Sequence, residues 1–427
     1  MADLVTRSRP RRLATVAVTS VLLLAAAAAP NASFGAEGTP VDLTMWVWPG
    51  ALSEKTLEAV AADYTDGSLK TSVIGDNFKT KLLTSFTANS NIPDITGVKG
   101  EDMPYFLQKP DLFTDLNTLG ISDILSEFPE WKLKEAMTPD GKLLGLPIDI
   151  GPTGLFYRED VLAEAGLPTD PAEVQAATST WEDYFAFGEK LKSATGAFLQ
   201  VNMADVFSFV MAQYPTKFVS ADGEFLGESP EVRRAWDLAV EAQQRGLTAG
   251  LQDGSPDWAS AVLSGTLPTV LGASWHAGDL KSSVADTAGK WRVTQMPGGP
   301  ANVGGSFLTI PAASKDKEAA IAIIRELLSA ENQATMFTDT GNFPARTSAF
   351  EEPAMKAPDP FFGGQDVVSE FALASESMPA VYNSPFDNVV AAAYYSELSN
   401  IESAGKDPEQ AWRDAVQAAS EALASSR

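Results

Sequence analysis

The sequence of 427 residues contains no cysteine and only one histidine, His276. The absence of cysteine excludes a disulfide framework, thiolate metal sites and a lipid anchor attached through a thioether. A single histidine excludes HExxH zinc sites and iron sites built from several histidines. The sequence also lacks GxxxxGK[ST] and a GxGxxG run after a strand, the loops that hold phosphate groups. We therefore predict a protein with no metal site and no cofactor.

Positive charge is scarce. The chain has 31 lysines and arginines against 56 aspartates and glutamates, so its formal net charge is −25. A strongly acidic surface favours solubility and repels polyanions. We expect neither a nucleic acid nor an anionic membrane surface as a partner.

Long apolar runs are absent as well, with one exception close to the N-terminus. There the basic segment RSRPRR is followed by LATVAVTSVLLLAAAAA and then by the small-residue stretch PNASFGA. This order is typical of an export signal that is cleaved near Gly35 or Ala36, so we assign residues 1–36 to a signal peptide. An uncleaved membrane anchor is the alternative, although the run is weakly hydrophobic and marginal in length for a stable span.

The remainder of the chain alternates helical and strand-like segments. Thr180-Trp181, Ser229-Pro230 and Asp407-Pro408 each place a capping residue before a helical pattern. Short apolar runs bounded by glycine or proline predict buried strands; they are 41–48, 71–75, 93–98, 143–148, 154–157, 267–275 and 304–311. Strands that alternate with helices predict an α/β architecture with mainly parallel sheets. The length predicts two domains or lobes.

Two tryptophans stand close together in the first strand-like run, VDLTMWVWPG. Trp46 and Trp48 are two residues apart, so they share a face of the strand. Trp46 lies inside the run, where packing in the core is expected. Trp48 lies at its end beside Pro49-Gly50, where it either covers the core or faces a loop region.

Signals for catalysis are weak. The segment GASWH (272–276) begins like the nucleophile elbow of a hydrolase, but His276 replaces the final glycine. Ser274 and His276 are nevertheless the candidates for part of a triad, and no pair of carboxylates stands out for glycoside hydrolysis. Adjacent Tyr394 and Tyr395 could bind ferric ion, yet their alanine-rich helical surroundings favour core packing. A secreted glycan-active enzyme is kept as an alternative to a binding protein.

The segment DGKLLGLPIDIGPTGLFYREDVLAEAGLPTDP (140–171) resembles the hinge-crossing region of extracellular solute-binding proteins of family 1. These are the sugar-binding subunits of ABC importers, similar to maltose-binding protein. Four further blocks resemble the family in the same order; they are LTMWVW, NIPDITGV, LSGTLPTVLGASWHAGDLK, and GGSFLTIPAASKDKEAAIAIIRELLSAENQATMF with NFPAR. Two departures are the missing lipobox cysteine and Leu267-Pro268-Thr269 in place of a small-residue run.

The resemblance implies a two-lobed periplasmic-binding-protein-like fold, each lobe a mainly parallel sheet flanked by helices, with a ligand cleft between the lobes. We expect residues 40–149 plus 307–350 in the N-terminal lobe and 150–306 plus 351–427 in the C-terminal lobe. It further implies a non-enzymatic, monomeric protein that closes around a carbohydrate and delivers it to the membrane permease subunits. The carbohydrate is expected to be an oligosaccharide. The protein would be exported to the extracellular or cell-envelope space, held near the membrane by the permease or by an uncleaved signal.

The resemblance also points to substrate-binding residues. Trp275 corresponds to a tryptophan that commonly stacks on sugar, and Trp48 lies where the family places a cleft loop. Gly304 and Gly305 lie where the chain would pass between the lobes for the second time, and glycine there would let backbone N–H groups approach a hydroxyl closely. The full set of implied binding residues is Trp48, Asp102, Asp149, Asp205, Trp275, Gly304, Gly305, Phe386 and Asp387. A two-lobed binder of a non-sugar solute, such as a metal, a polyamine or a phosphoester, is the other alternative.

Overall fold

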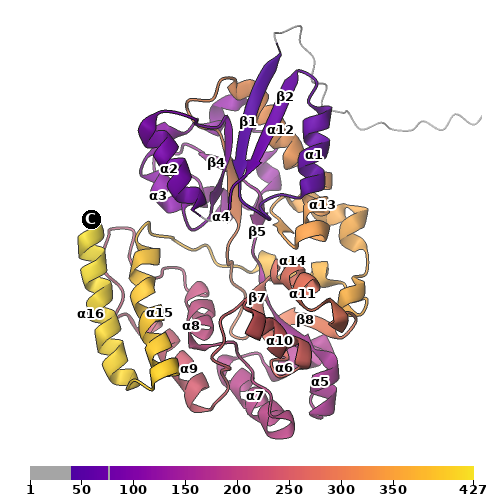
Figure 1. Ribbon diagram of the computed structural model, residues 1–427, viewed down its shortest axis with the longest axis vertical. Helices are drawn as coiled ribbons and strands as arrows, with labels where there is room; N and C mark the ends of the chain where they lie inside the picture. The colour runs from indigo at the N-terminus through magenta and orange to yellow at the C-terminus, as the bar shows by residue number, and fades with distance from the viewer. Residues whose placement is uncertain (1–39, 76) are drawn as a thin grey trace, which may run out of the picture. The chain divides into compact units, whose positions relative to one another are not determined.

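The computed structural model describes residues 40–75 and 77–427. The predicted signal peptide, residues 1–36, lies outside this range. Among the described residues, no helix is both long and apolar enough to cross a membrane. Figure 1 shows the arrangement of the helices and strands.

The first sheet has five strands in the order β2-β1-β3-β9-β4. Their bounds are β1 Val41–Val47, β2 Gly67–Val73, β3 Ile95–Lys99, β4 Gly145–Pro147 and β9 Ser306–Thr309. β1 runs parallel to β2 and β3, whereas β9 is antiparallel to both β3 and β4. β9 thus inserts between two strands that come much earlier in the chain.

The alternation of side chains along β1 decides which of its residues enter the core. Leu43, Met45 and Val47 are buried. Trp46 lies on the opposite face and is half-buried, with the ammonium group of Lys81 4.8 Å from its ring centre. The prediction that Trp46 belongs to the core is therefore wrong. Side chains alternate between the two faces of a strand, and in β1 the odd-numbered residues from Leu43 to Val47 point into the core.

Six α-helices accompany the first sheet, namely α1 Glu54–Asp63, α2 Phe78–Ala88, α3 Met103–Leu107, α4 Glu130–Glu135, α12 Lys317–Leu327 and α13 Ala330–Thr340. α1 and α12 contact each other, as Figure 1 shows. α2 brings Phe78 and Lys81 onto the face that carries the two tryptophans. The half-exposed face of β1 is therefore covered in part by α2.

The second sheet has three strands, with β6 Thr153–Arg158 in the middle between β7 Thr269–Ala273 and β8 Trp291–Gln295. β6 is antiparallel to both neighbours. The remaining α-helices are α5 Glu159–Glu164, α6 Pro171–Ala177, α7 Trp181–Thr195, α8 Met203–Ala212, α9 Pro230–Gln244, α10 Pro256–Ser264, α11 His276–Ser283, α14 Val367–Glu376, α15 Asp387–Ala404 and α16 Pro408–Ser426. Many of their apolar residues join β6 and β7 in one large core cluster.

Two crossings of the chain connect a strand of one large sheet with a strand of the other, and a third passage leads from β10 Phe343–Pro344 to α14, which contacts β6 and β8. The first crossing runs from β4 through β5 Asp149–Ile150 into β6, and the second runs from β8 to β9. β5 also pairs with β10 in a small antiparallel sheet. Seven short 3-10 helices complete the described chain; they are Pro110–Leu112, Leu116–Leu119, Leu125–Glu127, Ala285–Thr287, Thr347–Glu351, Pro353–Lys356 and Pro360–Phe362.

The predicted α/β architecture is confirmed, but the prediction of mainly parallel sheets is wrong. The first sheet is mixed and the second is antiparallel throughout. The parallel-sheet rule assumes that each strand is followed by a helix and then by its neighbour in the same sheet. Here β6 and β9 arrive directly from the other sheet, so they run against the strands that return through helices. The exact lobe boundaries stay a prediction.

Local capping chemistry was predicted correctly. The Thr180 hydroxyl accepts a hydrogen bond from the Asp183 N–H, the Ser229 hydroxyl accepts one from Val232, and the Asp407 carboxylate accepts one from Gln410. These bonds begin α7, α9 and α16 at the expected residues. Capping depends on neighbours within three positions, so it is visible in the sequence.

Candidate ligand cleft

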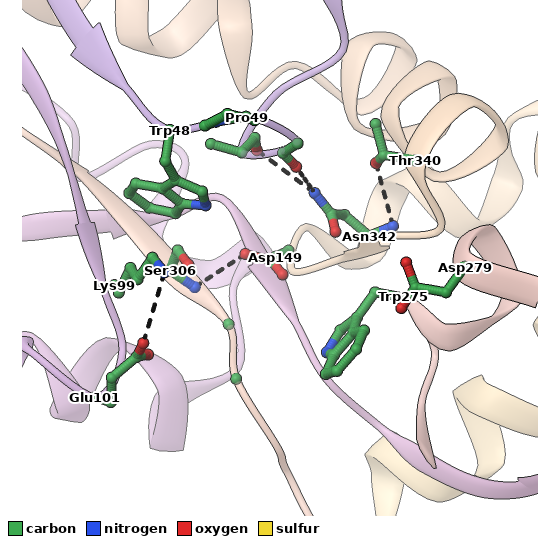
Figure 2. A pocket seen from close by; sticks show the side chains of 14 residues that line it. Trp48, Pro49, Lys99, Glu101, Asp149, Trp275, Asp279, Ser306, Thr340 and Asn342 are labelled. Carbon is green, nitrogen blue, oxygen red and sulfur yellow. Dashed lines mark hydrogen bonds and ion pairs between the residues drawn. The ribbon is translucent and has the colours of Figure 1, made fainter. Parts of the chain in front are cut away.

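A cleft of about 450 Å³ lies where residues of both large sheets meet the two crossings. It is lined by Trp48, Pro49, Gly50, Ala51, Lys99, Glu101, Asp149, Trp275, Asp279, Gly304, Gly305, Ser306, Thr340 and Asn342. Figure 2 shows Trp48 and Trp275 on opposite sides of this ligand cleft, with Asp149 between them. Its volume falls within the range of small-molecule sites, about 300–1,000 Å³.

Trp48 follows β1 directly and its ring is supported on several sides. Its centre lies 5.3 Å from that of Phe78 in an edge-on arrangement, and the Lys99 ammonium lies 5.5 Å from the ring centre. A Cβ at Gly97 would come within 2.7 Å of the indole, so this glycine leaves room for the ring. Trp48 also lines a second cavity of about 430 Å³ together with Phe78 and Asp102. Its indole therefore stands between two cavities.

Trp275 follows β7 and immediately precedes α11. Its Nε1–H donates a hydrogen bond of 3.3 Å to the carbonyl of Val303, in the second crossing. One face of the indole stacks on the ring of His276, with the ring centres 3.9 Å apart and the planes inclined by 24°. The side chain remains half-buried and lines the ligand cleft.

Asp149 lies in the first crossing and is buried, although it forms part of the cleft lining. Its Oδ1 accepts a 2.9 Å hydrogen bond from the backbone N–H of Ser306. Burial raises the pKa of this carboxyl to about 7, and the nearby Lys132 ammonium opposes the rise. The bond to Ser306 joins the first crossing to the second.

Lys132 on α4 is fully buried behind the crossings. Its Nζ donates to Glu135 Oε2 at 2.7 Å and to the carbonyl of Gly304 at 3.4 Å. A buried ammonium group needs such hydrogen-bond acceptors from the protein, because the removal of a charge from water costs free energy. Lys132 therefore ties α4 to the second crossing.

Gly304 and Gly305 both adopt positive φ, +89° and +79°. A Cβ at Gly305 would lie 2.6 Å from Lys132 Nζ and 2.9 Å from the carbonyl oxygen of Asp149. Both the backbone conformation and the close approach therefore require glycine at position 305.

The structure brings five of the nine predicted residues together in the ligand cleft, namely Trp48, Asp149, Trp275, Gly304 and Gly305. Asp102 lines the second cavity instead, and its Oδ1 lies 2.7 Å from the Lys79 ammonium. Their roles in binding stay a prediction.

Besides Asp102, three predicted residues are absent from the lining of the ligand cleft in the described part of the chain. Asp205 lies on α8, where burial and then the neighbouring Asp253 raise its pKa to about 7. Asp387 is buried, and its carboxylate accepts hydrogen bonds from the N–H groups of Phe218 and Ser384. Phe386 packs against the large core cluster. The last two residues therefore have structural contacts of their own.

Several lining residues were missed, notably Lys99, Glu101, Asp279 and Asn342. Lys99 is the last residue of β3 and Glu101 lies two residues beyond it. β3 is parallel to β1, so both strands end at the same edge of the first sheet. The rule that ligands bind at the carboxyl ends of strands could have identified them. Asn342 donates a 2.8 Å hydrogen bond to the carbonyl of Gly50. No local pattern signals this contact, because it joins segments far apart in the sequence.

The geometry does not support the alternatives of a catalytic site at Ser274 and His276 or of a metal site at Tyr394 and Tyr395. In the described residues, the Ser274 hydroxyl is buried and has no hydrogen-bond partner, so it forms no pair with His276. Tyr394 is buried in the core and donates to the carbonyl of Gly227 at 2.8 Å. Across residues 40–75 and 77–427, no group of three His, Cys, Asp or Glu side chains is arranged to hold a metal ion.

Comparison with known proteins identifies the class to which this fold and cleft belong. Residues 57–362, more than half of the chain, match the family of bacterial extracellular solute-binding proteins. The chain therefore belongs to this family, whose members are binding proteins. Membership of an extracellular family implies export from the cell.

Two similar relatives have been described as sugar-binding proteins. A lactose-binding protein of Rhizobium radiobacter is 29% identical over 402 residues, which cover 88% of this chain and 91% of that protein. An arabinooligosaccharide-binding protein of Bacillus subtilis is 26% identical over 317 residues, covering 70% and 71% of the two chains.

Solved structures confirm the predicted two-lobed fold. A crystal structure of an extracellular solute-binding protein of family 1 is 27% identical and superimposes with a TM-score of 0.83, covering 90% of this chain and 100% of that chain. The galacto-N-biose-/lacto-N-biose I-binding protein of Bifidobacterium longum is 20% identical, with a TM-score of 0.76 and coverage of 91% and 98%. The latter likeness concerns the fold alone.

Proposed function

We propose that this protein is the substrate-binding subunit of an ABC importer and that it binds a carbohydrate by closure of its two lobes. The observation that carries the proposal is the pair Trp48 and Trp275, which face one polar cleft from the ends of strands in different sheets. The lobe boundaries given by the sequence, 40–149 plus 307–350 and 150–306 plus 351–427, are part of the proposal.

The lining matches the chemistry of a sugar. A pyranose presents an apolar face of C–H groups that packs on an indole, while its hydroxyl groups need both donors and acceptors. Lys99 and Asn342 supply donors, and Glu101, Asp149 and Asp279 supply carboxylates. This mixture suits a neutral, polyhydroxylated ligand better than an anion, because carboxylates outnumber the ammonium group.

The ligand is proposed to be an oligosaccharide. The similar proteins are described as binding lactose or arabino-oligosaccharides, and the second cavity beside Trp48 extends the available surface. Asp102 would serve there rather than in the ligand cleft. The protein is proposed to act as a monomer outside the cytoplasm and to deliver its ligand to membrane permease subunits.

Calorimetric titration tests this proposal, with lactose and an arabino-oligosaccharide as probes and with spermidine and glycerol 3-phosphate as representatives of the other solute classes. A bound sugar should also raise the free energy of unfolding by about 2.7 kcal/mol at 100 times its dissociation constant. Binding of only the polyamine or the phosphoester would overturn the proposal. Release of shorter sugars during incubation, followed by chromatography, would instead identify a glycan-active enzyme.

A further inference from the structure

We propose that His276 is a positioning residue that holds the indole of Trp275 in its orientation toward the ligand cleft. The inference rests on the proposed function, because it assigns a role in sugar binding to a residue that does not itself line the cleft. It concerns the one histidine of the chain, whose ring is 5% exposed and lies behind Trp275.

The stack of the two rings is built into the fold. Residues 275 and 276 are adjacent in sequence, and their ring centres are only 3.9 Å apart with planes inclined by 24°. A Cβ at Gly272 would lie 2.6 Å from the His276 ring, so the glycine in β7 makes the space that the imidazole occupies. A larger residue at position 272 would push the imidazole out of this place.

The backbone of Trp275 is equally confined. A Cβ at Gly341 would come within 3.1 Å of the Cα and carbonyl oxygen of Trp275. The indole Nε1–H is directed to the carbonyl of Val303. One edge of the indole is thus bonded and one face is covered by His276, while the side chain lines the ligand cleft.

The imidazole is surrounded by acidic groups from three elements. Its Nε2 lies 3.4 Å from Oδ2 of Asp253, in the loop before α10. Asp205 on α8 and Asp279 in the first turn of α11 also interact with His276 electrostatically. Nδ1 is buried and has no hydrogen-bond partner among the described residues. The ring is therefore held by the stack and by Asp253 rather than by a network of hydrogen bonds on both nitrogens.

A role in core packing alone makes a different prediction. If His276 only fills space, its removal lowers the free energy of unfolding but leaves the affinity of each folded molecule for sugar unchanged. If it positions Trp275, its removal lets the indole reorient, and sugar affinity falls. A flat aromatic ring in its place should preserve the stack and hence the affinity.

The test compares His276→Ala, His276→Phe and the matched control Val284→Ala, which truncates a buried side chain at the end of the same helix. Titration with the sugar that the wild-type protein binds should give a dissociation constant about tenfold higher for His276→Ala. His276→Phe should recover most of the affinity, and Val284→Ala should match the wild type. Unchanged affinity in His276→Ala would overturn the inference.

A second measurement needs no ligand and so separates failure of this inference from failure of the proposed function. In crystal structures of the unliganded proteins, the Trp275 indole should keep its hydrogen bond to the Val303 carbonyl in the wild type and in His276→Phe and lose it in His276→Ala. An indole that keeps its place in His276→Ala would overturn the inference, whereas absence of sugar binding by the wild type would count against the proposed function.

Discussion

At the scale of single residues, Trp275 is the side chain on which sugar binding should depend most. A central aromatic ring in a cleft contributes about 2 kcal/mol or more to binding, which is roughly thirtyfold in the dissociation constant. We expect Trp275→Ala to lose at least this much affinity in a calorimetric titration. Trp46→Ala is the matched control, because Trp46 is half-buried in β1 but does not line the ligand cleft.

A denaturation curve for Trp275→Ala completes this test. If the indole were mainly a core residue, the substitution would cost about 3–5 kcal/mol of folding stability and leave affinity per folded molecule intact. Normal sugar affinity in a destabilised variant would contradict the stacking role and leave Trp48 as the principal aromatic contact.

Asp149 provides a prediction about pH. Burial raises its pKa from 3.8 to about 7 in the folded protein. The folded state therefore holds this proton more tightly than the unfolded state, and the free energy of unfolding falls as pH rises between these two values. Above pH 7 the full penalty of a buried carboxylate is present.

Asp149→Asn should remove this penalty while keeping an oxygen that accepts the bond from the Ser306 N–H. We expect the variant to be more stable than the wild type at pH 8, by about 1 kcal/mol or more, and the difference to vanish near pH 4. Urea unfolding at pH 8 and at pH 4 measures this difference in the free energy of unfolding. A stability difference that is the same at both would show that the carboxyl does not titrate as proposed.

At the scale of elements, the second crossing should tolerate substitution of its glycines poorly. Gly305→Ala must adopt positive φ and place a Cβ close to the carbonyl oxygen of Asp149. Strain of this kind costs about 1–3 kcal/mol, so we expect a loss of folding stability in urea unfolding. Gly120→Ala is the control, since Gly120 has φ +66° but no atom within 4 Å of its Cβ position.

Both variants carry the cost of a positive φ, but only Gly305→Ala also brings a Cβ close to other atoms. The difference between their losses in the free energy of unfolding therefore measures the effect of this close approach. Equal losses of stability would mean that the contact with Asp149 and Lys132 adds nothing. A larger loss in Gly305→Ala would show that the crossing is fixed by contacts from both sides.

The sequence predicted well those elements whose boundaries depend on residues close by in the chain. Capping residues such as Thr180 and Ser229 act on N–H groups three positions away, so helix starts could be located. Strand directions could not, because the places of β6 and β9 depend on segments that are distant in the sequence. β8 was missed altogether, although Trp291 and Val293 are buried within it.

The same distinction applies to the ligand cleft. Trp48 and Trp275 each end a strand, a position that the sequence reveals, and both line the cleft. The resemblance placed the segment of Phe386 and Asp387 near a cleft but did not show which side chains point into it. The Asp387 carboxylate accepts a hydrogen bond from the backbone N–H of Phe218, which is distant in the chain. Such a partner cannot be recognised from the local sequence.

At the scale of the whole molecule, the proposed closure of the lobes has a direct measure. Two short crossings connect strands of the two large sheets and line the cleft. Ligand that contacts both Trp48 and Trp275 binds better when the lobes approach, so it should shift the population toward a closed state. Small-angle X-ray scattering with saturating sugar should give a smaller radius of gyration than without it. An unchanged radius at saturation would contradict hinge closure.

The position of β9 in the first sheet also governs how the chain folds as it emerges. β9 separates β3 from β4, so these two strands have no common neighbour until residue 306 is available. About 160 residues lie between β4 and β9, and their synthesis takes roughly 10–30 s at ordinary translation rates. During that interval the two strand edges stay unpaired and the N-terminal sheet cannot form in its final order. The five-stranded sheet can therefore be completed only after β9 has been synthesised, so its final strand order depends on a late segment of the chain.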